Sequence, residues 1–237
     1  MDFKPNEFFL GLVDFIAILL PGCLLAGIFL MAEAQTPILK EPLYCIGLKD
    51  GVTVFFGIGY LFTGYTLGYF LSSTASCLDI VYDSIRDLIY PDKEAEIYSF
   101  SAHLLHLFFE LEWKIKPNKA LQQVEAIKPG KYLEGAVNHF QWSSIILDTY
   151  FPAAGEKASR SMAASKFFRS LVIVFLLAFA LQWGQWLPKT ISSSLWVGLT
   201  ILSFREYVVQ RQKSVQAAYR GMITFYHLPA EFKKELK

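Results

Sequence analysis

The chain has 237 residues, of which 54% are hydrophobic and 18% are charged, and its formal net charge at pH 7 is +1. Soluble domains carry about 25% charged residues, so this deficit indicates an unusually large core or contact with lipid. The near-neutral charge argues against a dedicated nucleic-acid binder, which normally has a strong basic excess.

The first long apolar run covers residues 8–32 and is interrupted only by Asp14. A membrane-spanning helix needs about 20 apolar residues, because it rises 1.5 Å per residue across a core of about 30 Å. A signal peptide would have a basic start, whereas Asp2 and Glu7 outnumber Lys4 here, and its apolar run would be shorter. We therefore predict a retained membrane helix. Pro21 falls halfway along it and is expected to kink it.

The second apolar run covers residues 51–73, and no charged residue occurs between Asp50 and Asp79. Gly57, Gly64 and Gly68 fall close to one face of the predicted helix, and the last two form a GxxxG pattern. Small residues let helix backbones approach closely in lipid. We predict close helix packing at these three glycines, within one subunit or between subunits.

The middle segment, 75–167, is charged but rich in apolar residues at helical spacing. The pattern predicts helices over 75–90, 98–114, 131–150 and 156–170, with turns at Pro117-Asn118 and Pro129-Gly130. His103, His106 and Glu110 share one face of the second of these helices, which makes them weak candidates for a metal site. No matching set of ligands occurs elsewhere, so we interpret them as the polar face of an amphipathic helix and predict no metal.

Two further apolar segments, 168–187 and 191–209, are separated by so few residues that they predict an antiparallel hairpin. Trp183, Trp186 and Trp196 cluster around this turn, as is typical of a bilayer interface. Arg205 and Glu206 shorten the last segment. The tail, 210–237, is predicted to begin as a helix that continues out of it.

The distribution of basic residues predicts the orientation. Ten lysines and arginines lie in 73–167 and seven follow residue 204, against two between residues 33 and 50 and one at Lys189. The middle segment and the tail are therefore predicted to face the cytoplasm. An even number of spans then places the N-terminus there as well.

These observations predict an all-α fold: a polytopic membrane protein with four transmembrane helices and a helical cytoplasmic insert between the second and third. We expect four parts: an N-terminal transmembrane pair, the insert, a C-terminal transmembrane hairpin and a cytoplasmic tail. Their bounds are 1–74, 75–167, 168–209 and 210–237. The expected location is the plasma (inner) membrane of the cell, with both termini cytoplasmic.

Charged residues next to lipid are the candidates for function. An ionised carboxylate at mid-membrane costs about 2.5–3.5 kcal/mol, so Asp14 is expected to face a partner or water. Arg169 and Arg205 lie at the cytoplasmic ends of the last two spans, at a depth suited to pairing with it. These three residues and Pro21 are candidates for a pore or gate, and a purely structural ion pair is the alternative.

No catalytic or nucleotide-binding motif is present, and we predict neither an enzyme nor a cofactor. The leading hypothesis is an oligomeric membrane effector or ion channel gated through the insert by a ligand or a protein partner. In layout only, this is similar to small membrane effectors of prokaryotic antiviral systems. The alternatives are a membrane scaffold for a cytoplasmic partner protein and a small lipid-acting enzyme. The expected partners are the lipid bilayer, further copies of the chain and a cytoplasmic protein, but not nucleic acid.

Overall fold

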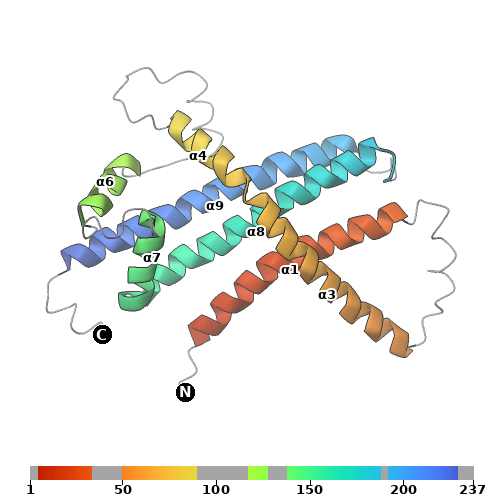
Figure 1. Ribbon diagram of the computed structural model, residues 1–237, viewed down its shortest axis with the longest axis horizontal. Helices are drawn as coiled ribbons and strands as arrows, with labels where there is room; N and C mark the ends of the chain where they lie inside the picture. The colour runs from red at the N-terminus through yellow and green to blue at the C-terminus, as the bar shows by residue number, and fades with distance from the viewer. Residues whose placement is uncertain (1–4, 34–49, 90–116, 128–137, 188–191, 229–237) are drawn as a thin grey trace. The chain divides into compact units, whose positions relative to one another are not determined.

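The computed structural model describes residues 5–33, 50–89, 117–127, 138–187 and 192–228 (Figure 1). Within these ranges the chain forms seven helices and no strand, which confirms the predicted all-α class. In chain order they are α1 (Pro5–Glu33), α3 (Asp50–Ala75), α4 (Leu78–Ile89), α6 (Pro117–Ile127), α7 (His139–Tyr150), α8 (Pro152–Trp183) and α9 (Ser193–His227).

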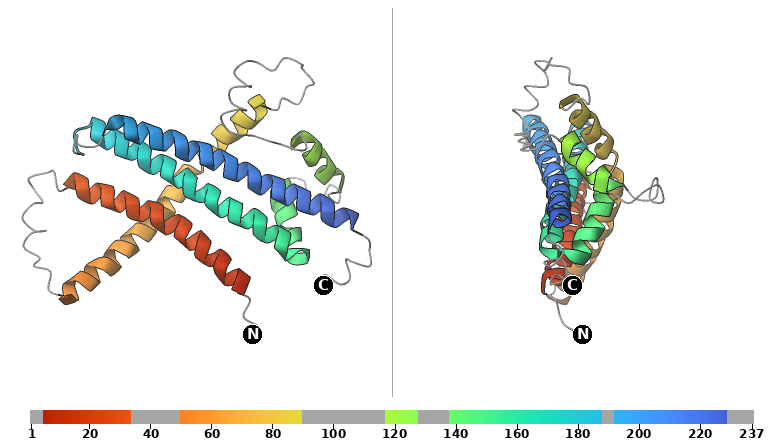
Figure 2. Two further views of the ribbon diagram at one scale, coloured as in Figure 1. Left: turned by 180° about the vertical axis from the view of Figure 1, so that it is seen from behind. Right: turned by 90° about the vertical axis from the view of Figure 1, so that its left-hand side faces the viewer.

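The helices divide into two compact units. Unit 1 comprises Met1–Leu10, Val81–Ser165 and Val208–Lys237, and unit 2 comprises Gly11–Ile80 and Lys166–Tyr207. The long helices α8 and α9 contribute residues to both units, and they lie side by side in both views of the ribbon (Figures 1 and 2). Each unit therefore contains one half of the same antiparallel helix pair.

Helix boundaries follow local chemistry, with two corrections to the predictions. The helix predicted over 131–150 begins at His139, because the extended backbone and capping side chain of Asn138 end it there. Pro117 was predicted to mark a turn, but it is the first residue of α6. That prediction was wrong because proline suits the first helical position, where its fixed φ fits and no amide hydrogen is needed. Asn138 caps α7: its side chain accepts from the backbone N–H of Gln141, whose own side chain accepts from the N–H of Asn138. Residues 98–114, predicted as a helix, lie outside the described residues.

Unit 2 exposes apolar side chains on several helices. Large hydrophobic residues reach the surface along α1, α3, the second half of α8 and the first half of α9. Examples are Phe15, Leu20, Met31, Phe55, Phe62, Phe70, Leu176 and Leu202. Among the described residues of unit 1, the exposed large hydrophobics are Val81, Ile145 and Tyr226. The two units therefore have surfaces of different polarity, and that of unit 2 suits an apolar solvent.

Two helices are long and apolar enough to cross a membrane, judged by length and composition: Gly11–Ala32 of α1 and Pro152–Trp183 of α8. Two of the four predicted spans therefore meet this criterion among the described residues. Glycines, threonines and tyrosines dilute the apolar character of α3. In α9, Arg205 and Glu206 interrupt the apolar stretch.

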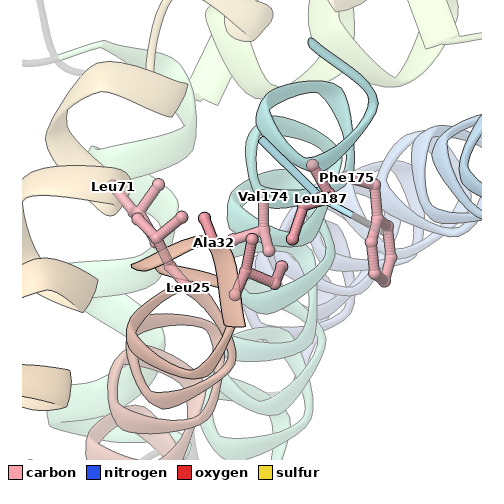
Figure 3. Close-up of a cluster of buried hydrophobic side chains, with 8 residues drawn as sticks. Leu25, Ala32, Leu71, Val174, Phe175 and Leu187 are labelled. Atoms are coloured by element: carbon pink, nitrogen blue, oxygen red, sulfur yellow. The ribbon is translucent and has the colours of Figure 1, made fainter. Parts of the chain in front are cut away.

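The core of unit 2 joins α1 and α3 to the hairpin of α8 and α9 (Figure 3). Leu25 and Leu71 pack with Val174 and Phe175, and the Phe175 ring lies 6.2 Å from that of Trp196 on α9. Such buried side chains each contribute about 1.5–3 kcal/mol where the exposed alternative is water. The core therefore joins the four long helix segments of unit 2.

The core of unit 1 forms where α7 packs on α9 and on the first half of α8. Leu147 is fully buried against Ala158 and Ala218, and the ring of Tyr150 stacks on that of Phe225 at 5.8 Å. The Ser214 hydroxyl donates to the Ala158 carbonyl at 2.8 Å. Small residues on α8 and α9 thus let these helices approach closely, and α7 lies against both.

Asp148 on α7 provides a pH-dependent test of this packing. A Cβ atom added at Gly155, in the first turn of α8, would overlap Asp148 Oδ1. Burial raises the pKa of the Asp148 carboxyl group. A raised carboxyl pKa means that ionisation opposes folding, so stability falls as pH rises through the folded-state pKa. Asp148→Asn is expected to raise the melting temperature slightly at pH 7. The gain should disappear below pH ~3, where the Asp148 carboxyl group is protonated in both the folded and the unfolded chain. An equal gain at both pH values, measured by thermal denaturation, would contradict this assignment.

Candidate functional site

A close helix contact in unit 2 is the crossing of α1 and α3, which is made at glycines. A Cβ atom added at Gly22 would overlap the carbonyl oxygen of Gly64, and one added at Gly68 would overlap the carbonyl oxygen of Ile18. The two backbones are therefore in direct contact. Pro21, predicted as a gating residue, is fully buried one position before Gly22.

Three further residues belong to this crossing and were not singled out from the sequence. The Tyr60 hydroxyl on α3 donates to the backbone carbonyl of Cys23 on α1 at 2.5 Å. Gly27 leaves room for it, since a Cβ atom there would lie 3.3 Å from the same hydroxyl. The small residues Gly22, Cys23, Ala26 and Gly27, at helical spacing, were the available signal. Of the predicted packing glycines, Gly57 alone meets nothing within 4 Å among the described residues.

Asp14 pairs with Lys166, not with either arginine that the sequence suggested. The Lys166 Nζ lies 3.3 Å from Asp14 Oδ1, and the two side chains are 42% and 51% exposed. The predicted pairing with Arg169 or Arg205 was wrong, because packing brings a different residue of α8 beside α1. Arg205 instead pairs with its neighbour Glu206 at 2.7 Å.

Arg169 belongs to a more buried cluster, formed by Arg169, Asp79 and Tyr207, which we call the Asp79 cluster. Arg169 donates to Asp79 Oδ2 at 2.7 Å and to the Ser72 carbonyl at 3.2 Å. The Tyr207 hydroxyl donates to the other carboxylate oxygen, Oδ1, at 2.7 Å. Both oxygens of Asp79 are thus occupied, by donors on α8 and α9.

Burial and position strengthen the Asp79 cluster. The Arg169 side chain is 12% exposed and Tyr207 is fully buried. Asp79 also sits in the first turn of α4, where the helix dipole favours a negative charge. The cluster ties the junction of α3 and α4 to α8 and α9. Its arrangement suits a fixed contact that must break before these helices move apart.

The structure gives no support for a metal centre in the part it describes. There, no group of three or more histidine, cysteine or acidic side chains could hold an ion. The weak candidates His103, His106 and Glu110 lie outside the described residues.

Comparison with protein-family models, curated proteins and solved structures gives no match to this chain.

Proposed function

We propose that this protein is a multi-pass membrane protein with four spans, in which unit 1 and both termini face the cytoplasm. The observation that carries the proposal is the apolar surface of unit 2, which is exposed on all four of its helices. In water, such a surface would drive aggregation. In a bilayer, lipid tails would cover it at no cost, since they are as apolar as the side chains themselves.

Two features support α3 and α9 as the spans that composition alone does not identify. α3 has 26 residues and no charged residue after Asp50, and Phe55, Phe62 and Phe70 are exposed along it. The Ser193–Phe204 part of α9 carries no charge, and Arg205 then falls where a long side chain reaches the headgroups. Trp183 and Trp186, both exposed, would mark the opposite interface.

Within this membrane arrangement we propose an oligomeric effector or channel controlled through unit 1. α8 contains no glycine or proline between residues 156 and 183, and α9 contains none between residues 199 and 220. Each helix passes from one unit to the other within that range. Uninterrupted helices transmit a displacement, because bending requires such breaks. Four spans are too few to enclose a pore, so a channel would need several copies, with the exposed Asp14–Lys166 pair as a candidate lining.

The first experiment tests the membrane arrangement. The three native cysteines are replaced by alanine, and single cysteines are introduced as Lys157→Cys, Lys213→Cys and Lys189→Cys. In intact cells, a membrane-impermeant maleimide is expected to label only the Lys189 variant, and permeabilisation is expected to expose the other two. Labelling of all three in intact cells, or recovery of the chain in the soluble fraction without detergent, would refute the proposal.

The second experiment separates a channel from a scaffold. The detergent-solubilised protein is sized by native mass spectrometry and then reconstituted into liposomes that contain a potassium-sensitive dye. We expect a closed oligomer and measurable potassium flux, and a change in that flux in Asp14→Asn but not in the matched variant Glu156→Gln in unit 1. A monomer without flux would favour the scaffold instead.

A further inference from the structure

Arg211 on α9 is a partly buried cation that has no carboxylate partner among the described residues. Its guanidinium carbon lies 5.7 Å from the centroid of the Phe140 ring on α7, and one terminal nitrogen donates to the Met162 sulfur on α8 at 2.8 Å. Its Nε is buried and has no partner among the described residues. A thioether is a weak acceptor, and a guanidinium placed between two helices usually binds an anion. Arg211 therefore has the chemistry of an incomplete ion pair.

Other donors without a partner among the described residues lie on α9 itself and on α7, the helix of Phe140. Ser143 and Ser144 follow Phe140 by three and four residues, which places them on the same side of α7, one turn further along. Ser143 is fully buried, and neither hydroxyl has a partner among the described residues. Gln212, next to Arg211, is 5% exposed, and its amide nitrogen is also unpaired there. Buried polar groups rarely remain unsatisfied, and all of these can donate a hydrogen bond to an oxygen acceptor.

The described carboxylates of unit 1 near this position are engaged or placed elsewhere. Glu125 contacts His139 at 3.4 Å, and Glu156 pairs with Arg160 within α8. Asp148 lies against Gly155, two turns along α7 from Phe140. Within the part of unit 1 that the structure describes, no carboxylate pairs with Arg211.

We propose that unit 1 binds a phosphate group between α7, α8 and α9, held by Arg211 with Ser143 and Ser144 as further donors. A phosphate presents several acceptor oxygens, which matches a guanidinium and hydroxyls that lack acceptors. The assignment is independent of the proposed membrane function, because every residue it uses lies in unit 1. The phosphate could belong to a small soluble molecule or to a lipid headgroup.

The test uses the full-length protein in neutral detergent, with inorganic phosphate and pyrophosphate as soluble probes and phosphatidylglycerol as the lipid probe. Sodium chloride at equal ionic strength is the salt control. We expect one probe class to raise the melting temperature and to bind with a stoichiometry of one per chain. Arg211→Gln is expected to weaken this binding by about 10-fold or more, since hydrogen bonds to charged groups contribute about 1.5–3 kcal/mol.

Lys213→Gln is the matched control, because it removes the same charge from an exposed position two residues away on α9. It is expected to bind as the wild type does. Equal weakening in both variants would indicate only general electrostatics and would overturn the proposal. Absence of saturable binding by the wild-type protein would overturn it as well, whatever the variants do. If Arg211→Gln does not fold, Arg211→Lys keeps the charge but loses the planar fork, and unchanged affinity in that variant would also contradict the assignment.

Discussion

Adding one methyl group at Gly22 is expected to destabilise the protein strongly, whereas the same change at Gly57 is expected to be tolerated. A Cβ atom at Gly22 would overlap the backbone of Gly64 and of Gly68 on the neighbouring helix. Overpacking typically costs about 1–3 kcal/mol, and we expect the upper end, because backbone atoms cannot move aside as a side chain does. The measurement is the melting temperature and the size-exclusion profile of Gly22→Ala in detergent.

Gly57→Ala is a matched control, because the substitution is identical and the site is also inside a helix of unit 2. A Cβ atom there meets nothing within 4 Å among the described residues. Alanine is favoured over glycine in helices by about 1 kcal/mol, so this variant should be neutral or slightly more stable. If instead Gly57→Ala were the damaging change and Gly22→Ala harmless, the α1–α3 crossing would be elsewhere. Gly57 would then be the contact, for example with a second copy of the chain.

Neutralising Asp79 is expected to have the second largest effect. Asp79→Asn removes the charge that faces Arg169 and leaves that side chain, which is 12% exposed, without its carboxylate. Breaking a buried ion pair in this way costs about 3–5 kcal/mol, and the 33% exposure of Asp79 reduces the expected loss to about 2 kcal/mol. Thermal denaturation of the single variants and of Asp79→Asn with Arg169→Gln gives a double-mutant cycle. The double variant should lose less than the sum of the two single losses.

The exposed pair of Asp14 and Lys166 is the comparison for this cycle. Asp14→Asn is the same chemical change, but the two side chains of this pair are 42% and 51% exposed, and their charged atoms lie 3.3 Å apart. Exposed ion pairs contribute about 0–1 kcal/mol, so the loss should be small. A larger loss for Asp14→Asn than for Asp79→Asn would mean that the Asp79 cluster does not hold the helices together.

These two contacts make different contributions to the proposed function. The glycine crossing fixes α1 to α3 by backbone contact and leaves little freedom for movement. The Asp79 cluster depends on charge and hydrogen bonds, which can be broken and remade. If unit 1 controls the membrane helices, the cluster is the contact whose breakage we expect to change potassium flux in the liposome assay.

The helical class could be predicted from the amino-acid sequence, but several helix starts could not. α6 was not predicted, and α7 begins at His139, whereas the pattern predicted a helix from residue 131. Runs of apolar residues longer than a soluble helix needs, and apolar positions at helical spacing in the middle segment, predicted helices that the structure contains. Pro117 illustrates the difficulty, since a proline can follow the end of one helix or be the first residue of the next. The glycine pattern at Gly64 and Gly68 predicted a close contact but did not specify the partner.

Which residues meet depends on how the whole helices pack against one another. Asp14 could have faced any cation at the right depth, and the choice of Lys166 over Arg169 follows from how α8 is rotated and shifted against α1. That register depends on the packing of whole helices, and residues 152 positions apart carry no local signal of it. For the same reason, the sequence could not predict the contact of Arg169 with Asp79 and Tyr207 or that of Arg211 with Phe140. Local pattern specifies a helix and its apolar residues, whereas the partners of its few charges are fixed when the helices pack together.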